Sequence, residues 1–100
     1  MTKLGNRSSL TTGEKTVTTA GTAEQLPDVA VPEDFEAIVT AKHANTGRIY
    51  IGGTKAEAEA HTVSLGSDDV FHEYLTNLNA LWIDVDIGHD GEGIDYEVPQ

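Results

Sequence analysis

The carboxylates near the end of the chain are the residues whose type and spacing could bind a metal ion. In a twelve-residue calcium loop that starts at Asp86, Asp90 takes the fifth position, Gly91 the sixth and Glu97 the twelfth. However, Gly88 occupies the third position, and strands rather than helices are expected on both sides of the loop. We therefore favour a solvated acidic loop without a cofactor over a Ca²⁺ site at Asp86, Asp90 and Glu97.

Histidine and serine side chains could carry zinc or nucleophilic chemistry. No two histidines have the spacing of zinc ligands; they are His43, His61, His72 and His89. Ser64 and Ser67 are close to His61 in sequence, but neither lies in a nucleophile elbow, and no glycine-rich phosphate loop precedes a helix. The sequence favours a protein that is not an enzyme.

Alternating apolar residues predict the strands that position these side chains. The clearest is residues 80–86, where Leu81, Ile83 and Val85 are expected to face inward. A hairpin is predicted across residues 37–53, because Asn45-Thr46-Gly47 tolerates the backbone angles of a tight turn.

Two later segments complete the pattern. Residues 61–75 predict another hairpin, and the sequence leaves open which face of residues 70–75 is inside. Residues 54–60, TKAEAEA, predict an insertion loop with at most one or two helical turns.

The spacing of the strands predicts the fold class. About seven or eight short strands favour an all-β antiparallel sandwich, jelly-roll-like, over a barrel that encloses a ligand. Residues 1–13 are polar and predict a flexible N-terminal arm, and residues 14–100 predict the β-sandwich domain.

The composition limits the partners. Seventeen acidic against six basic residues give a formal charge of -11, which excludes nucleic acid as a partner for most of the surface. A halophilic origin and an ordinary acidic surface both explain this charge. No apolar run approaches the roughly 18 residues of a transmembrane helix, so no membrane partner is expected and the chain is expected to be soluble.

Some apolar residues are expected on the outer faces of the strands. If Val39 and Ile83 face the core, then Ile38 and Trp82 face outward on the same strands, and Tyr50 does so next to Ile51. Exposed aromatic and aliphatic residues favour an interaction surface that a homo-oligomer would cover. The alternative is that loops or the arm bury both faces.

The arm could contribute to the same interface. Lys3 and Arg7 lie in a segment with no acidic residue before Glu14. Such charge asymmetry could guide the arm onto an acidic neighbouring subunit.

The order of these segments resembles a class of small virion proteins of tailed phages and archaeal tailed viruses. The similarity rests on EKTVTTAGTAEQL, AIVTAKHANTGRIYIGG, NLNALWIDV and GEGIDYEV. The resemblance implies a β-sandwich on the virion, as a capsid decoration, turret or fibre-base protein without catalytic residues. The TKAEAEA insertion and the acidity depart from this class and leave the position on the particle open.

Together these observations predict a viral structural protein on the outer capsid surface. We expect a homo-oligomer, with a trimer favoured over a pentamer, that docks on the major capsid protein. One alternative is a carbohydrate- or receptor-binding module, in which Trp82, Tyr50 and Tyr74 form a stacking platform beside Ca²⁺ near Asp86 and Asp90. The other is a tail or head-to-tail connector component.

Overall fold

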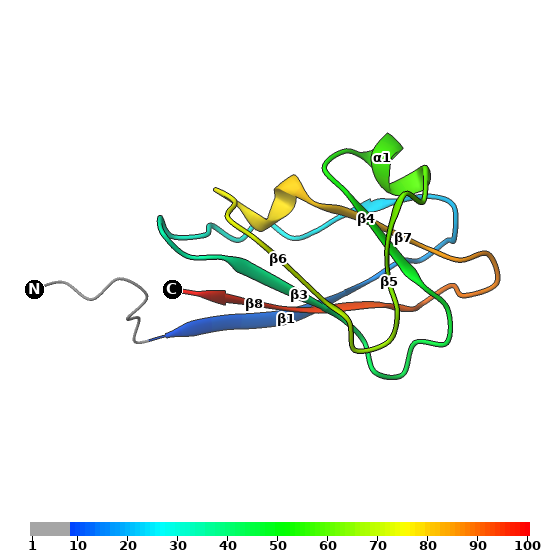
Figure 1. Ribbon diagram of the computed structural model, residues 1–100, viewed down its shortest axis with the longest axis horizontal. Helices are drawn as coiled ribbons and strands as arrows, with labels where there is room; N and C mark the ends of the chain where they lie inside the picture. Colours follow the sequence, from blue (N-terminus) through cyan, green and yellow to red (C-terminus); the bar gives the residue numbers. More distant parts are fainter. Residues whose placement is uncertain (1–8) are drawn as a thin grey trace, which may run out of the picture.

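The structure is a computed structural model that describes residues 9–100, and it consists of two antiparallel sheets packed face to face (Figure 1). Sheet A has the strand order β1-β8-β3-β6 and sheet B the order β2-β7-β4-β5. The elements are β1 (Leu10–Thr16), β2 (Glu24–Gln25), β3 (Ala37–Ala41), β4 (Ile49–Gly52), α1 (Lys55–Glu59), β5 (Val63–Leu65), β6 (Val70–Glu73), the short 3-10 helix η1 (Leu78–Ala80), β7 (Trp82–Val85) and β8 (Gly93–Pro99).

The topology is that of a long hairpin rolled into a sandwich. Strand β1 pairs with β8, β2 with β7, β3 with β6 and β4 with β5. Two further pairings, β3 with β8 and β4 with β7, close the sheets. This is the jelly-roll arrangement, so the prediction of an all-β, jelly-roll-like sandwich is confirmed.

Alternation along the strands builds the core between the sheets. Ile83 and Val85 on β7 are fully buried, as expected, and they share one core with Val39 of β3 and Ile94 of β8 from the other sheet. Each such aliphatic side chain contributes roughly 1.5–3 kcal/mol when it leaves water. On β6 the structure decides the open question, because Phe71 packs against the core while Val70 is exposed.

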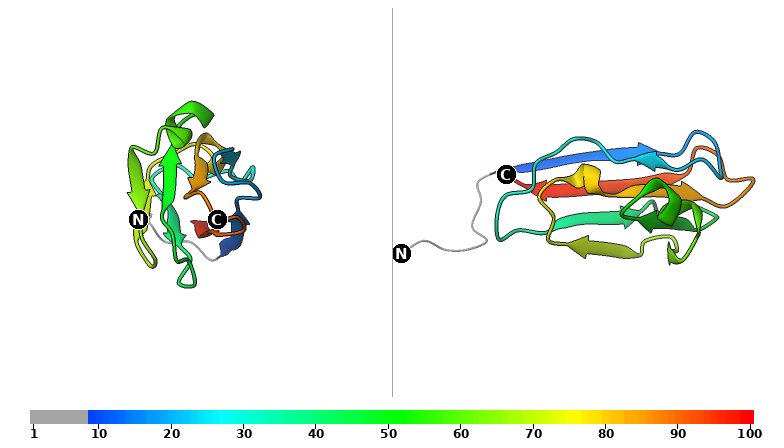
Figure 2. Two further views of the ribbon diagram at one scale, coloured as in Figure 1. Left: turned by 90° about the vertical axis from the view of Figure 1, so that its right-hand side faces the viewer. Right: turned by 90° about the horizontal axis from the view of Figure 1, so that it is seen from above.

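The predicted hairpin across residues 37–53 is wrong. Strand β3 belongs to sheet A and β4 to sheet B, so the connection between them crosses from one sheet to the other (Figure 2). Asn45 is buried there, and its side-chain amide donates to the Gly93 carbonyl at 2.8 Å. A Cβ at Gly47 would meet the His89 ring at 2.7 Å. Asn45 and Gly47 therefore serve tertiary contacts rather than a tight turn.

The hairpin predicted across residues 61–75 is wrong for the same reason, since β5 lies in sheet B and β6 in sheet A. The boundary of the arm also needs correction. Strand β1 begins at Leu10, because residues 10–16 pair along the whole of β8. Only residues 1–8 of the predicted arm lie outside the described residues.

The segment TKAEAEA forms helix α1, which packs on the outer face of sheet B against β4 and β7. Thr54 caps it by accepting a hydrogen bond from the Glu57 backbone N–H. Gly52 allows the close approach, because a Cβ there would meet the Ala58 nitrogen at 2.5 Å. This helix covers part of the outer face of sheet B, where the sequence predicted exposed Tyr50 and Trp82 side chains.

Candidate interaction surface

The residues predicted to form an interface lie on two opposite faces of the sandwich. Ile38 is on the outer face of sheet A, in register with His72 and Glu97. Tyr50 and Trp82 are on the outer face of sheet B. All three side chains are partly buried rather than part of the core. Lys3 and Arg7, the other predicted interface residues, lie outside the described residues.

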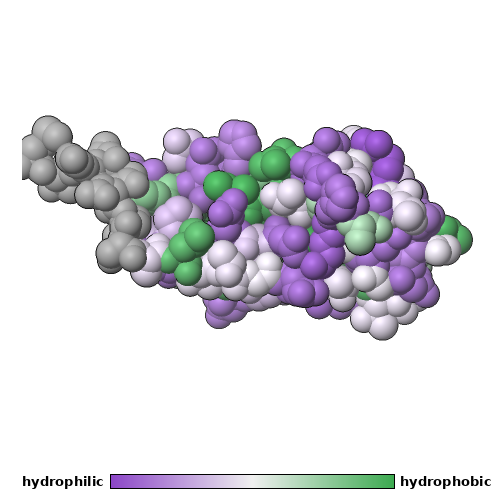
Figure 3. Space-filling model, turned by 90° about the horizontal axis from the view of Figure 1, so that it is seen from below, coloured by the Kyte–Doolittle hydropathy of each residue, from purple (hydrophilic) through white to green (hydrophobic). Residues whose placement is uncertain are grey.

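The outer face of sheet A carries apolar side chains in separate groups. Leu10 and Val70 are each 53% exposed on this face, and Ile38 lies two residues along β3 from Thr40, the partner of Val70. The view from below shows separate hydrophobic areas with hydrophilic surface between them (Figure 3). The face therefore does not form one continuous apolar patch.

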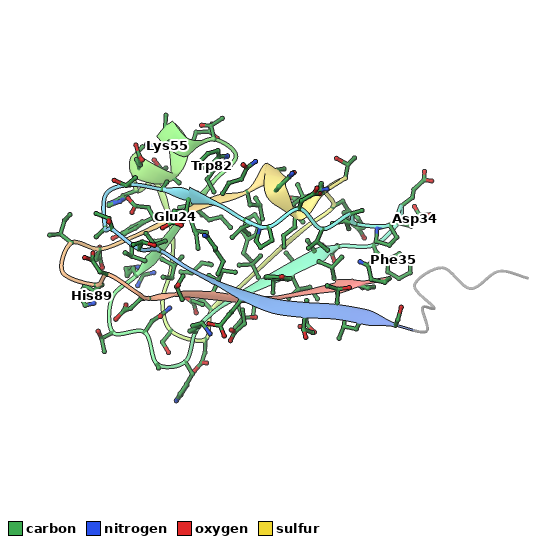
Figure 4. The ribbon with its side chains drawn as sticks, turned by 180° about the vertical axis from the view of Figure 1, so that it is seen from behind. Glu24, Asp34, Phe35, Lys55, Trp82 and His89 are labelled. Atoms are coloured by element: carbon green, nitrogen blue, oxygen red, sulfur yellow. The ribbon has the colours of Figure 1, made fainter. Side chains whose placement is uncertain are left out.

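The outer face of sheet B is occupied by contacts within the chain. The Tyr50 and His61 rings stack with centroids 3.8 Å apart, and the Tyr50 hydroxyl donates to Asp86 at 2.5 Å. That hydrogen bond, with burial, raises the pKa of Tyr50. Trp82 lies beside α1 (Figure 4). Tyr74 follows β6 in the other sheet, so the structure does not gather the predicted aromatic platform.

Asp84 is the buried polar centre of that face. Its side chain is fully buried and accepts hydrogen bonds from His61 Nε2 at 2.7 Å and from the backbone N–H of Gly21 and Val85, both at 2.8 Å. The direction of Asp84 follows from strand alternation. Its burial does not, because the partners His61 and Gly21 come from distant loops.

The three carboxylates of the calcium hypothesis are not brought together. Asp86 accepts from the Arg48 backbone N–H, and Asp90 accepts from the Ala20 N–H. Glu97 lies on β8 in sheet A. Within residues 9–100, no three carboxylate or histidine side chains gather in a way that could hold a metal ion.

Every histidine contacts a carboxylate; the pairs are His43 with Asp68, His61 with Asp84, His72 with Glu36 and His89 with Glu92. The hydrogen bonds from Asp68 and Glu36 raise the pKa values of His43 and His72. These two histidines are therefore more readily protonated than free histidine.

Glu92 ties the loop between β3 and β4 to its own loop between β7 and β8. Burial raises its pKa, but the hydrogen bonds outweigh burial and hold the pKa at about 2. The donors are the backbone N–H groups of Thr46 and Gly47 and the side chains of Thr46 and His89. Glu92 is thus a structural carboxylate.

The candidate nucleophiles also have other partners. Ser64 Oγ accepts from Arg48 Nε, and Ser67 Oγ donates to the carbonyl of His43.

The two long edges of the sandwich differ. At the edge formed by β1 and β2, Lys15 points toward the core side and its ammonium bridges the sheets to Glu24 at 2.8 Å. The hydrogen bond from Lys15 lowers the pKa of Glu24. An inward-pointing charge on an edge strand discourages another strand from pairing there.

The opposite edge, formed by β5 and β6, is open, and we call it the β5/β6 edge. Each strand is the last in its sheet, so one side of its backbone has no strand partner in the described chain (Figure 2). Val63 is 48% exposed on β5, and Tyr74, just after β6, is 64% exposed. Sequence reasoning missed this edge because pairing decides which strands are outermost.

A groove of about 390 Å³ opens along the β5/β6 edge between the two sheets. Its apolar wall consists of Ile51, Val63, Phe71 and Leu81, and Glu57 of α1 adds a carboxylate. No lysine or arginine lines it. An extended segment with an apolar side chain and nearby positive charge would match this surface.

The chain was compared with protein-family models, with curated proteins and with solved structures, and none of them matches. Among residues 9–100, no helix has the length and apolar character needed to cross a bilayer.

Proposed function

We propose that this chain is a non-enzymatic structural protein of a tailed virus that self-associates and docks on the outside of the capsid. The observation that carries the proposal is the β5/β6 edge, where two edge strands and an apolar groove lie open together. Exposed apolar groups beside unpaired strand edges are typical of surfaces that bind another chain. The capsid location rests on the sequence resemblance, since a jelly roll alone does not assign a function.

The mechanism is adhesive. A partner strand along β5 or β6 would satisfy backbone groups, while an apolar side chain in the groove would supply affinity. A stable interface covers about 800 Å² on each partner, which is a modest part of the 5568 Å² surface of this molecule. One long side of the sandwich can provide that area.

Salt should favour association. Each copy carries a formal charge of -11, so two copies repel each other in dilute buffer. At 1 M salt the screening length falls to about 3 Å, which removes most of this repulsion.

Sedimentation of the full chain at low and high salt, with one matched pair of variants, tests self-association. Val63→Glu places a charge at the groove, and Ile87→Glu places the same charge on an exposed loop residue. We expect Val63→Glu to weaken association about tenfold or more and Ile87→Glu to leave it unchanged. A chain that is monomeric at both salt concentrations, or two variants with equal effects, would contradict self-association through this edge.

Binding to purified shells of the major capsid protein tests the location. The unaltered chain should co-sediment with the shells, and Val63→Glu should co-sediment less. If the chain instead binds purified tails or connectors and not shells, the connector alternative replaces the capsid one.

A further inference from the structure

The shape of the groove points to the kind of segment that it binds. Its mouth lies between the two edge strands β5 and β6, and its floor is formed by Ile51 and Leu81. A segment that enters from the edge can pair with one of these strands while it inserts an apolar side chain. The occupant should therefore be an extended segment with one apolar anchor.

The charge around the groove selects a basic segment. Glu57 lines the groove, and Asp69 and Glu73 are exposed on the adjoining turn and strand. The whole chain has a formal charge of -11, and residues 1–8 contain two basic residues, Lys3 and Arg7, and no acidic one. Residues 9–100 therefore carry a formal charge of -13. An acidic segment would be repelled from this surface.

Residues 1–8 of the chain, MTKLGNRS, have these properties. Leu4 directly follows Lys3, Arg7 comes three residues after Leu4, and the segment contains no acidic residue. Leucine is a suitable anchor for an apolar groove, and the two cations complement the acidic rim.

The distance along the fold favours the segment of another copy. The register of sheet A aligns Phe71 of β6 with Gly13 of β1, three strands away. Leu10 lies three residues before Gly13 on β1. The separation between Leu10 and Phe71 is about 18 Å, and passing around β6 to the groove adds about 5 Å. The six residues from Leu4 to Leu10 span at most about 20–22 Å. A second copy removes this limit.

We propose that the groove at the β5/β6 edge binds residues 1–8 of a second copy, with Leu4 in the groove and Lys3 and Arg7 against its acidic rim. This proposal rests on the proposed self-association and names the segment that produces it. Each copy then gives one segment and receives one.

Disulfide trapping tests the contact directly, because the natural chain contains no cysteine. Full-length Leu4→Cys is mixed with full-length Val63→Cys under mild oxidation, and with Thr22→Cys as the control. Thr22 is an exposed residue just before β2, at the opposite edge. We expect the disulfide between positions 4 and 63 to form at least tenfold faster than that between positions 4 and 22. Equal rates would overturn the proposal.

A chain that carries both Leu4→Cys and Val63→Cys separates the two routes of docking. We expect its oxidation to give covalent dimers and larger species whose share rises with protein concentration. A product that is entirely an internally crosslinked monomer at every concentration would overturn docking on a second copy.

An affinity measurement distinguishes failure of this inference from failure of the proposed function. Leu4→Asp should weaken self-association about tenfold or more, whereas Thr2→Asp, with the same added charge, should have a much smaller effect. If Val63→Glu abolishes association while Leu4→Asp leaves it intact, another partner surface fills the groove and the inference is wrong. If the unaltered chain does not associate at all, both are wrong.

Discussion

Replacing Asp84 by alanine would remove the acceptor on which three hydrogen-bond donors converge. The carboxylate is fully buried on the outer face of sheet B, beneath the His61 side chain and next to the loop that contains Gly21. The donors are His61 Nε2 and the backbone N–H groups of Gly21 and Val85. In Asp84→Ala these groups lose their common partner.

The cost follows from how much water can replace the carboxylate. Removing one partner of a buried pair costs roughly 3–5 kcal/mol, and a buried donor left unsatisfied costs roughly 1–3 kcal/mol. The His61 side chain is 32% exposed and Gly21 lies at the surface, so water can bind both. We therefore expect the free energy of unfolding to fall by about 3 kcal/mol, the lower end of the range. For a domain of this size the melting temperature would fall by about 12 °C or more.

Urea unfolding of the full chain at neutral pH measures this loss. Asp95→Ala is the matched control, because Asp95 is an exposed carboxylate on β8 that pairs with Lys42 at 2.7 Å. A surface pair of this kind contributes roughly 0–1 kcal/mol. Asp84→Asn keeps an acceptor oxygen and should lie between the two. If Asp84→Ala and Asp95→Ala unfold within about 1 kcal/mol of each other, the reasoning about buried acceptors is refuted.

Three further predictions concern pH and packing. The lowered pKa of Glu92 contributes stability above pH 4.5, and this stability is lost as the pH falls toward about 2. Glu92→Gln should therefore lower the free energy of unfolding at pH 7 by about 2–3 kcal/mol. In urea titrations, the stability of this variant should fall less steeply between pH 4.5 and about pH 2. The raised pKa values of His43 and His72 contribute stability that is complete below pH 6.5 and is lost as the pH rises through those pKa values. The melting temperature of the double variant His43→Asn, His72→Asn should therefore fall less above pH 6.5 than that of the unaltered chain. Gly52→Val should displace α1 and lower the free energy of unfolding in urea by about 1–3 kcal/mol. The control is Gly88→Val, whose side chain would enter open space, so that its effect reports only the strain of a positive φ.

The strands and their faces could be predicted from local pattern, but their pairing could not. Alternation at residues 81–85 identifies both the strand and its buried side. The segment around Asn45 carries turn-forming residues that suit a hairpin and equally suit a crossing between sheets. Only the contact between Asn45 and Gly93, which are 48 residues apart, decides between them. Hairpins were therefore predicted where the jelly roll has crossings.

The candidate site was hidden for the same physical reason. The groove forms where Val63 and Phe71, from different sheets, both stand on edge strands. No short-range signal in residues 61–75 marks β5 and β6 as edge strands. The outward direction of the Tyr50 and Trp82 side chains was predictable from strand alternation. That α1 and His61 cover these side chains was not, because it depends on how the seven-residue insertion folds back onto Gly52.

The ion pair between Lys15 and Glu24 has a consequence for how large an assembly can grow. A new strand on that flank would have to desolvate a charged pair that already holds the sheets together. Continuous strand pairing from one sandwich to the next through this edge is therefore disfavoured, which guards an acidic, Thr-rich β protein against fibre formation. A copy that binds others through the β5/β6 edge, as proposed, and not through the β1/β2 edge would suit a finite particle, in which geometry sets the number of copies.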